Sequence, residues 1–316
     1  MDGLQFKMSY DVSSEPIDAD WIDRIGERRG TNGNGYLNEK PGSLFQVAIG
    51  FPPPTSLQLK VRNMGDEGRQ GTPLQTAAGN PSFETANLLR HGPPVVFRRF
   101  FARSEAECRK SGVALRFGTF SELIRANEEN ASNWRSLVPV LDPRWGSLGE
   151  NSFCLLGVNN DGHVVAAQAA RLYDFGLGNL KTQTECGRLL IPPRYPHDGG
   201  DWKGEHLRFR VCAPAAIQIT GKAVYSGATW YRPDYRGQML SSIVPRTGRA
   251  LAYTMWGNDY FFSFVETALM TKKMLDRYGY SQAEFGVTVA FNDQIIFDGG
   301  LIWMHSSELI TDLSRF

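Results

Sequence analysis

Residues 223–256, AVYSGATWYRPDYRGQMLSSIVPRTGRALAYTMW, decide the fold of this chain. Residues 223–230 alternate as a strand does, and a helical pattern follows the turn from Arg232 to Gly237 at once. A strand, a basic turn and the start of a helix therefore follow one another directly. Such a junction combines unpaired backbone amides with the positive end of a helix dipole, so it predicts an anion site suited to a pyrophosphate.

The helix after the turn has defined ends in the sequence. Apolar and small residues recur at helical spacing, and Gly257 is placed to end the helix. Pro245 fits only in the first turn, because a proline deeper in a helix would cost about 3 kcal/mol. The sequence therefore predicts a helix that begins near Ser241 or Ser242.

The charge balance excludes several classes of partner. With 34 Lys and Arg against 33 Asp and Glu, the formal net charge is +1, so no global field favours nucleic acid or an anionic membrane. No apolar run approaches roughly 18 residues, and residues 1–22 carry acidic side chains where a signal peptide would be basic and then apolar. We expect a cytoplasmic protein with no nucleic acid and no membrane among its partners.

The cysteines and histidines indicate no metal or redox chemistry. The cysteines are widely spaced, without a CxxC pair, at Cys108, Cys154, Cys186 and Cys212. We therefore expect reduced thiols rather than a zinc site or a disulfide framework. None of the five histidines pairs with an acidic or cysteine partner at ligand spacing, so we predict no metal and no nucleophilic triad.

Residues 1–94 differ in texture from the rest of the chain because glycine and proline are interleaved through them. Their apolar content is too high for a fully disordered tail, and their glycine and proline content is too high for an independent core. A disordered tail and a docked arm both stay open. A Gly-Pro-Pro hinge at residues 92–94 then marks the boundary between this N-terminal extension and a main domain over residues 95–316.

The main domain shows a regular succession of elements. Strands are expected at residues 113–117, 153–158, 164–172, 223–230, 260–265, 285–291, 294–297 and 301–304. Helices are expected at residues 121–138, with Ser121 as N-cap, after the basic turn, and at residues 272–278, where Gly279 ends the helix.

This order of elements resembles that of the GNAT family of acyl-CoA-dependent N-acyltransferases over roughly residues 113–304. The residues that carry the resemblance are Asn159-Asn160-Asp161-Gly162, Arg232-Pro233-Asp234-Tyr235-Arg236-Gly237 and Asp276-Arg277-Tyr278-Gly279-Tyr280. The resemblance implies an α+β fold, with a three-layer α/β/α arrangement and a twisted mixed sheet that is mainly antiparallel. It also implies a groove for acyl-CoA where two neighbouring strands part.

In this family the turn has the pattern Arg/Gln-x-x-Gly-x-Gly/Ala, whose amides hold the pyrophosphate of coenzyme A. Arg236 takes the first position, whereas Met239 and Ser241 stand where small residues are usual, and glycine there lets phosphate approach the main chain closely. The resemblance implies acetyl-CoA or another acyl-CoA as co-substrate. The candidate cofactor-binding residues are Thr229, Trp230, Tyr231, Arg236, Gly237, Gln238, Met239, Leu240, Ser241 and Ser242.

The resemblance also implies direct attack of an amine on a thioester, which needs a base for the amine and an acid for the departing thiolate. The family's usual tyrosine position is Leu275 here, and Tyr278, three residues later on nearly the same helical face, is the substitute candidate. Glu266, at the end of the strand over residues 260–265, is the candidate base. A packing role for Tyr278 and a surface role for Glu266 stay open.

Two hypotheses follow. The first is an acyl-CoA-dependent N-acyltransferase acting on a small-molecule or peptide amine, with an extension that covers the substrate or mediates a homodimer. The second is a catalytically inactive GNAT-fold binding or interaction module, which Met239, Ser241 and Leu275 favour. Whether Met239 blocks the groove or points away discriminates between them.

Overall fold

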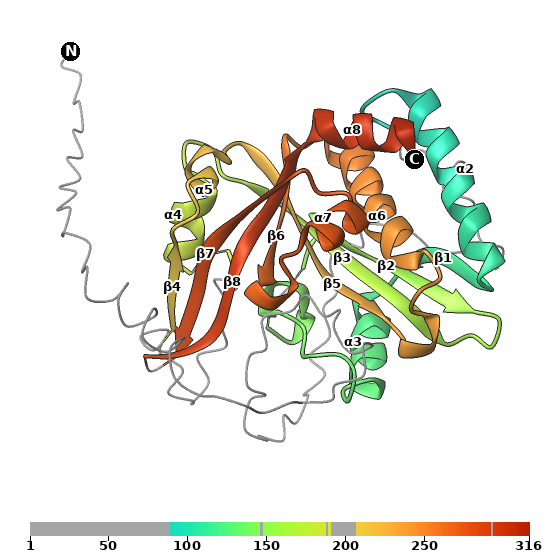
Figure 1. Ribbon diagram of the computed structural model, residues 1–316, viewed down its shortest axis with the longest axis horizontal. Coiled ribbons are helices and arrows are strands. Elements are labelled where there is room, and N and C mark those ends of the chain that lie inside the picture. Colours follow the sequence, from blue (N-terminus) through green and yellow to red (C-terminus); the bar gives the residue numbers. More distant parts are fainter. Residues whose placement is uncertain (1–88, 146–147, 188, 191–206, 292) are drawn as a thin grey trace, which may run out of the picture. The chain divides into compact units, whose positions relative to one another are not determined.

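An eight-stranded sheet organises the described part of the chain (Figure 1). The computed structural model describes residues 89–145, 148–187, 189–190, 207–291 and 293–316, which belong to one compact unit. The expectations for residues 1–88 lie outside the described residues. The boundary at residue 94 and the role of the extension therefore stay predictions.

Each strand and helix expected in the main domain has a counterpart. The strands are β1 (Val113–Gly118), β2 (Ser152–Asn159), β3 (Val164–Asp174), β4 (Leu207–Val211), β5 (Lys222–Tyr231), β6 (Tyr260–Glu266), β7 (Gln282–Phe291) and β8 (Gln294–His305). The α-helices are α2 (Pro94–Lys110), α3 (Phe120–Glu129), α4 (Leu180–Glu185), α5 (Ala215–Gln218), α6 (Leu240–Trp256), α7 (Lys272–Tyr278) and α8 (Ser306–Arg315). The 3-10 helices are η1 (Pro139–Leu141), η2 (Pro143–Trp145), η4 (Pro233–Tyr235) and η5 (Thr267–Leu269).

The sheet is mixed and mainly antiparallel, with helices on both faces. The strand order is β1-β2-β3-β5-β6-β8-β7-β4, and among these strands the pair β5–β6 alone is parallel. One hydrophobic cluster joins one face to α2, α6, α7 and α8, and a second joins the other face to α3, α4 and α5. These three layers confirm the predicted α+β class and the α/β/α arrangement (Figure 1).

The strands β5 and β6 part soon after they begin. Their register contains three pairs, of which Tyr225 with Phe262 is the last. Further along, β5 carries an extra residue relative to β3, between Gly227 and Trp230, and Ala228 there has a φ of 51°. A bulge of this kind bends the strand that contains it. From Ser226 onward the β6 side of β5 therefore has no strand partner in the described part of the chain.

The helix α6 begins earlier than the sequence predicted. It starts at Leu240, with Met239 as N-cap, so the expectation that Pro245 lies in the first turn is wrong. The amides of Ser242 and Ile243 both bond to the Met239 carbonyl, at 2.8 and 3.2 Å, which fixes the first turn ahead of the proline. Pro245 then lies in the second turn, where it removes only the bond that the Ser241 carbonyl would accept.

Other boundaries also differ from the expectations. The helix expected over residues 121–138 ends at Glu129, and its N-cap is Thr119 rather than Ser121. The last two expected strands are one strand, β8, which pairs with both β6 and β7 through Gly299 and Gly300. A side chain at Gly299 would collide with the Val265 carbonyl, and one at Gly300 would collide with Met270. Small residues at these two positions keep the strand continuous against its neighbours.

The start of α3 has a complete capping box. The hydroxyl of Thr119 accepts from the Glu122 amide at 3.2 Å, and Glu122 accepts from the Thr119 amide at 2.8 Å. A hydrogen bond from Arg116, at 2.7 Å, is the main reason why the pKa of Glu122 falls to about 2. Because the carboxylate is favoured in the folded state, its contribution to stability is present above the unfolded pKa of about 4.3 and is lost as the pH falls towards 2.

We therefore expect Glu122→Gln to lower the free energy of unfolding by about 1 kcal/mol at pH 7, the usual scale of a cap. The difference from the wild type should vanish between about pH 5 and pH 2, because the wild-type carboxylate then becomes protonated. Urea denaturation across this range measures it. Glu129→Gln, which changes an exposed carboxylate at the other end of α3, is the matched control, and an equal pH dependence in both variants would contradict the assignment.

None of the helices in the described residues is both long enough and apolar enough to cross a membrane.

Candidate functional site

The turn between β5 and α6 presents a row of unpaired amides. Among the described residues, none accepts a hydrogen bond from the amides of Gly237, Gln238, Met239, Leu240 or Ser241. Residues 237–239 are exposed, so a ligand can reach them from solvent. Free amides at the start of a helix, together with its dipole, form a binding site for an anionic group. The structure therefore leaves these amides open where the sequence predicts an anion site, and anion binding at this turn stays a prediction.

Met239 holds a backbone conformation that glycine adopts easily. Its φ is 64°, in the left-handed region, and its side chain is 58% exposed. The exposed side chain does not pack into the space between β5 and β6. A methionine in this conformation costs about 1–2 kcal/mol relative to glycine, so the turn keeps a glycine-like shape at the residue that departs from the family pattern.

The β5 candidates Thr229, Trp230 and Tyr231 are buried, with exposed fractions of 7%, 0% and 3%. Trp230 stacks on Trp134 on the face away from α6, with ring centroids 4.6 Å apart. Its side chain is therefore a packing residue. Thr229 and Tyr231 face α6 instead, since Thr229 lines a cavity with Arg249 and Tyr231 belongs to the cluster around α6.

Tyr278 lies where β5 and β6 part. It is 3% exposed, lines the same cavity as Thr229, and its hydroxyl has no hydrogen-bond partner in the described part of the chain. Burial raises the pKa of Tyr278 above its ordinary value, because it disfavours the phenolate. The phenol therefore stays protonated through the neutral range and can donate a proton or a hydrogen bond.

Glu266 lies on the other face of the sheet. Along β6, Phe264 packs with the cluster of α3 to α5 and Val265 with the cluster of α6, so Glu266 shares the face of Phe264. Its carboxylate forms an ion pair with Arg135, next to Trp134. The structure thus does not bring Glu266 and Tyr278 to one face. They could act on one ligand only across the gap between the strands.

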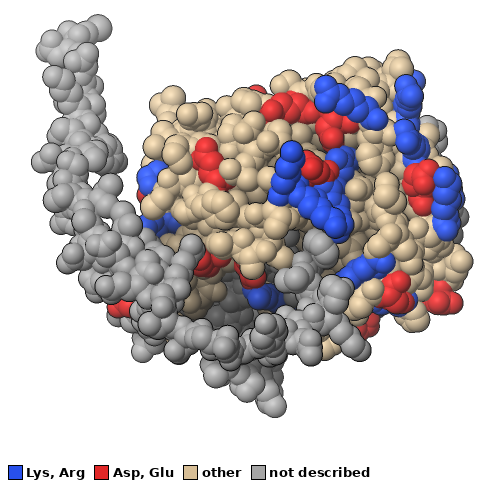
Figure 2. Space-filling model, viewed as in Figure 1, with Lys and Arg blue, Asp and Glu red and all other residues tan. Residues whose placement is uncertain are grey.

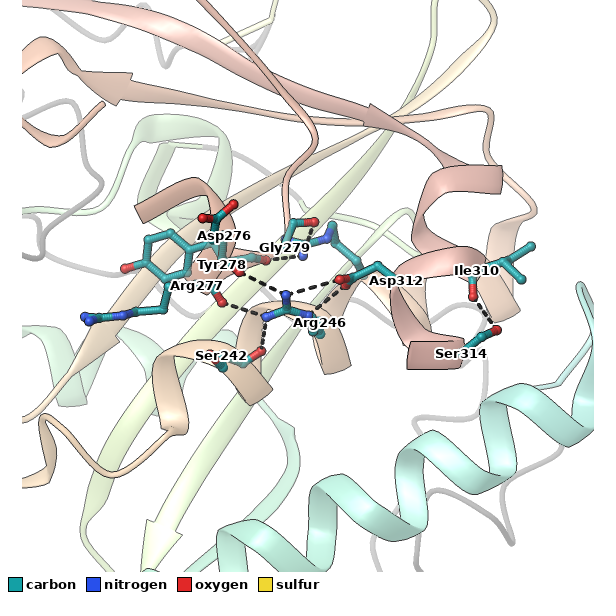
Figure 3. A network of polar contacts seen from close by, with 10 residues as sticks. Ser242, Arg246, Asp276, Arg277, Tyr278, Gly279, Ile310, Asp312 and Ser314 are labelled. Atoms are coloured by element: carbon teal, nitrogen blue, oxygen red, sulfur yellow. Dashed lines mark hydrogen bonds and ion pairs between the residues drawn. The ribbon is translucent and has the colours of Figure 1, made fainter. Parts of the chain in front are cut away.

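Arg246 ties together the helices that cover this gap (Figure 3). From α6 it bonds to Asp312 of α8 at 2.7 Å and to the carbonyls of Asp276 and Arg277, at 3.0 and 2.6 Å. It also lies against Gly279, whose φ of 72° and lack of space exclude a side chain. This clamp holds the end of α7, and hence Tyr278, against α6.

The clamp and the neighbouring Arg249 were not among the candidate residues. Arg246 and Arg249 are 6% and 1% exposed and lie on the inner side of α6. The signal in the sequence is a pair of arginines, three residues apart, in a helix whose other residues are mostly apolar or small. Arginine is almost never fully buried without a partner, so such a pair marks either a structural clamp or a binding site.

The surface next to this region is basic. Figure 2 shows Lys and Arg side chains gathered over α7, which contributes Lys272, Lys273 and Arg277 around the acidic Asp276. Both lysines are exposed. Among the described residues, no group of three or more His, Cys, Asp or Glu is placed to hold a metal ion.

No family model matches the chain, and no curated protein matches it. Solved structures do match in part. Two are structures of spermidine N-acetyltransferase from Vibrio cholerae, one dodecameric and one in complex with CoA and spermine, and a third is RimJ from Mycobacterium smegmatis in complex with CoA-disulfide. Their identities are 8%, 9% and 10%, and their TM-scores 0.38, 0.34 and 0.35. The matches cover 63%, 63% and 64% of this chain and 96%, 99% and 88% of those chains. Likenesses at this level do not identify a function.

Met239→Gly tests whether the turn is an anion site limited by its methionine. We expect the free energy of unfolding to rise by about 1 kcal/mol, because the left-handed strain disappears. We also expect coenzyme A to bind several-fold more tightly, because phosphate can approach the main chain more closely. Denaturant titration and calorimetry measure the two effects.

Asp293→Gly is the matched control, since Asp293 also has a positive φ, of 63°, in the β7–β8 turn. It should leave coenzyme A affinity unchanged. Weaker binding to Met239→Gly than to the wild type would show that the methionine side chain, not the main chain, makes the contact.

Proposed function

We propose that this chain is an acyl-CoA-dependent N-acyltransferase. The observation that carries the proposal is the parting of the parallel strands β5 and β6 after three residue pairs, next to a helix start with free amides. A ligand whose anionic group binds these amides would extend from them into the gap between β5 and β6. A ligand with a pyrophosphate at one end and a reactive acyl thioester at the other, such as acetyl-CoA or another acyl-CoA, matches this arrangement.

The residues of the turn fit the phosphate end of such a ligand. The amides of Gly237 to Ser241 would donate to the pyrophosphate, with the Arg236 guanidinium and the hydroxyls of Ser241 and Ser242 beside them. The basic side chains of α7 would add attraction for further phosphate groups. The unpaired β6 side of β5 would offer main-chain donors and acceptors to the amides of the pantetheine arm.

The sheet faces suggest how the two reactants would be separated. The acyl-CoA would enter on the α6 side, and an amine would approach from the Glu266 side, where a carboxylate attracts an ammonium group. Glu266 would take a proton from the amine, the amine nitrogen would form the amide bond, and the carbon–sulfur bond would break. Tyr278 would give its proton to the leaving thiolate. A small-molecule or peptide amine is therefore the proposed acceptor, and a cytoplasmic location and a homodimer remain predictions from the sequence.

An inactive binding module is the competing hypothesis. The ion pair between Arg135 and Glu266 favours it, because an incoming amine must displace a guanidinium before the carboxylate can act as a base. Coenzyme A binding without turnover of any amine would support this second function.

Arg236→Glu tests the proposed cofactor site. We expect calorimetry to detect micromolar binding of coenzyme A to the wild type and none to the variant, because a carboxylate beside the pyrophosphate repels it. Arg125→Glu makes the same charge change on the exposed side of α3, on the other face of the sheet, and should bind as the wild type does. No binding heat with folded wild-type protein at several temperatures would refute the proposal.

Tyr278→Phe and Glu266→Gln test the proposed chemistry. We expect each to lower kcat by roughly 10²–10⁴ while the affinity for coenzyme A stays constant. Tyr278→Phe should be at least as stable as the wild type, because it removes a buried hydroxyl without a partner. Steady-state kinetics with an amine found by screening measure kcat, and thermal unfolding measures the stability of the variants. Unchanged kcat in both variants would remove these residues from the mechanism.

A further inference from the structure

A small cavity lies at the point where β5 and β6 part, beneath α6. Its volume is about 10 Å³, at the lower limit for a cavity that can hold one water molecule. The polar side chains in its wall are Ser226, Thr229, Arg249, Ser263, Tyr278 and Tyr280. They come from β5, β6, α6, the end of α7 and the segment after it, so the cavity lies where the strands part rather than at the surface turn.

Arg249 is the charged group in this wall, and it is only partly satisfied. Its Nη2 donates to the carbonyls of Tyr278 and Gly279, and its guanidinium lies 4.3 Å from the centre of the Tyr280 ring. Its Nε and Nη1 have no partner among the described residues. A buried guanidinium with two unmatched nitrogens, which carry three N–H groups, is costly, since each desolvated donor loses its bonds to water.

Among the described residues that line the cavity, none carries a negative charge to balance Arg249. The carboxylate of Asp312 is engaged by Arg246 at 2.7 and 3.2 Å. The other polar side chains in the wall are hydroxyls, and those of Ser263 and Tyr278 have no partner in the described part of the chain. The Ser226 hydroxyl already accepts from Gln168 at 2.5 Å, so its own hydrogen is free to be donated. The wall therefore suits a ligand that accepts hydrogen bonds and carries negative charge.

The position of the cavity connects it to the proposed groove. Arg249 follows Leu240 by nine residues, so it lies about 14 Å along α6 from the free amides. An extended pantetheine arm that begins at those amides would bring its acyl group to this depth. An apolar acyl group would leave the guanidinium unmatched, and an ammonium group would be repelled by it.

We propose that Arg249 binds the carboxylate of a short dicarboxylic acyl group carried by coenzyme A, of the malonyl or succinyl class. The inference rests on the proposed function and specifies its donor. One carboxylate oxygen occupies the cavity and accepts from the free N–H groups of Arg249 and from the hydroxyls around it. The rest of the acyl group lies in the gap between β5 and β6.

The test compares acyl-CoA affinities by calorimetry in the absence of an amine. For the wild type we expect malonyl-CoA or succinyl-CoA to bind at least 10-fold more tightly than butyryl-CoA, with free coenzyme A as the reference. Arg249→Met should abolish this preference and leave the affinity for free coenzyme A unchanged, whereas Arg249→Lys should keep part of it. Arg125→Met, which removes an exposed charge of α3 on the other face of the sheet, should leave the preference intact.

A purely structural role for Arg249 would lower the melting temperature of Arg249→Met without giving the wild type any preference among acyl groups. If the Arg249 variants do not fold, Ser263→Ala and the wild-type comparison decide, because Ser263→Ala should reduce the preference severalfold. Coenzyme A binding with equal affinities for the acidic and neutral acyl groups would overturn the inference and leave the proposed function standing. Failure of coenzyme A itself to bind would remove both.

Discussion

The parting of β5 from β6 is the constraint on which the proposed cofactor site depends. Two parallel strands joined by a helix would normally pair along their length, yet here the pairing stops at Tyr225 and Phe262. The bulge around Ala228 bends β5. The divergence leaves a stretch of unpaired strand edge inside the sheet. Unpaired backbone groups are costly when buried, so an edge of this kind is normally hydrogen-bonded to another segment, to water or to a ligand.

The helices on one face hold this opening in shape. Arg246 links α6 to α8 and to the end of α7, and Arg249 bonds to the carbonyls of Tyr278 and Gly279. These contacts fix Tyr278 at the point where β5 and β6 part. The open amides lie at the other end of this region, at the start of α6. The open amides of the turn, the unpaired edge of β5 and the buried arginine thus all follow from the way α6 packs on the two strands.

Much of this arrangement could be predicted from local sequence. Residues 223–256 indicate the strand, turn and helix because alternation gives way to helical spacing at a basic turn, and α7 is bounded by Gly279 as expected. Pro245 misled the prediction of the helix start, because the left-handed backbone at Met239 begins the helix before the proline. The ion pair between Arg135 and Glu266 joins segments distant in sequence, so it leaves no local pattern. Arg246 and Arg249 do leave a local signal, as two arginines of one helix face, but that signal does not distinguish a structural clamp from a binding site.

Amide-resolved hydrogen exchange with and without coenzyme A tests most directly whether coenzyme A binds at the start of α6 and along the unpaired edge of β5. Bound coenzyme A should strongly protect the amides of Gly237 to Ser241, which have no partner among the described residues, and should also protect residues 226–231 of β5. Protection confined to other segments, or none at saturating coenzyme A, would contradict the claim that the parted strands and the helix start form one cofactor site.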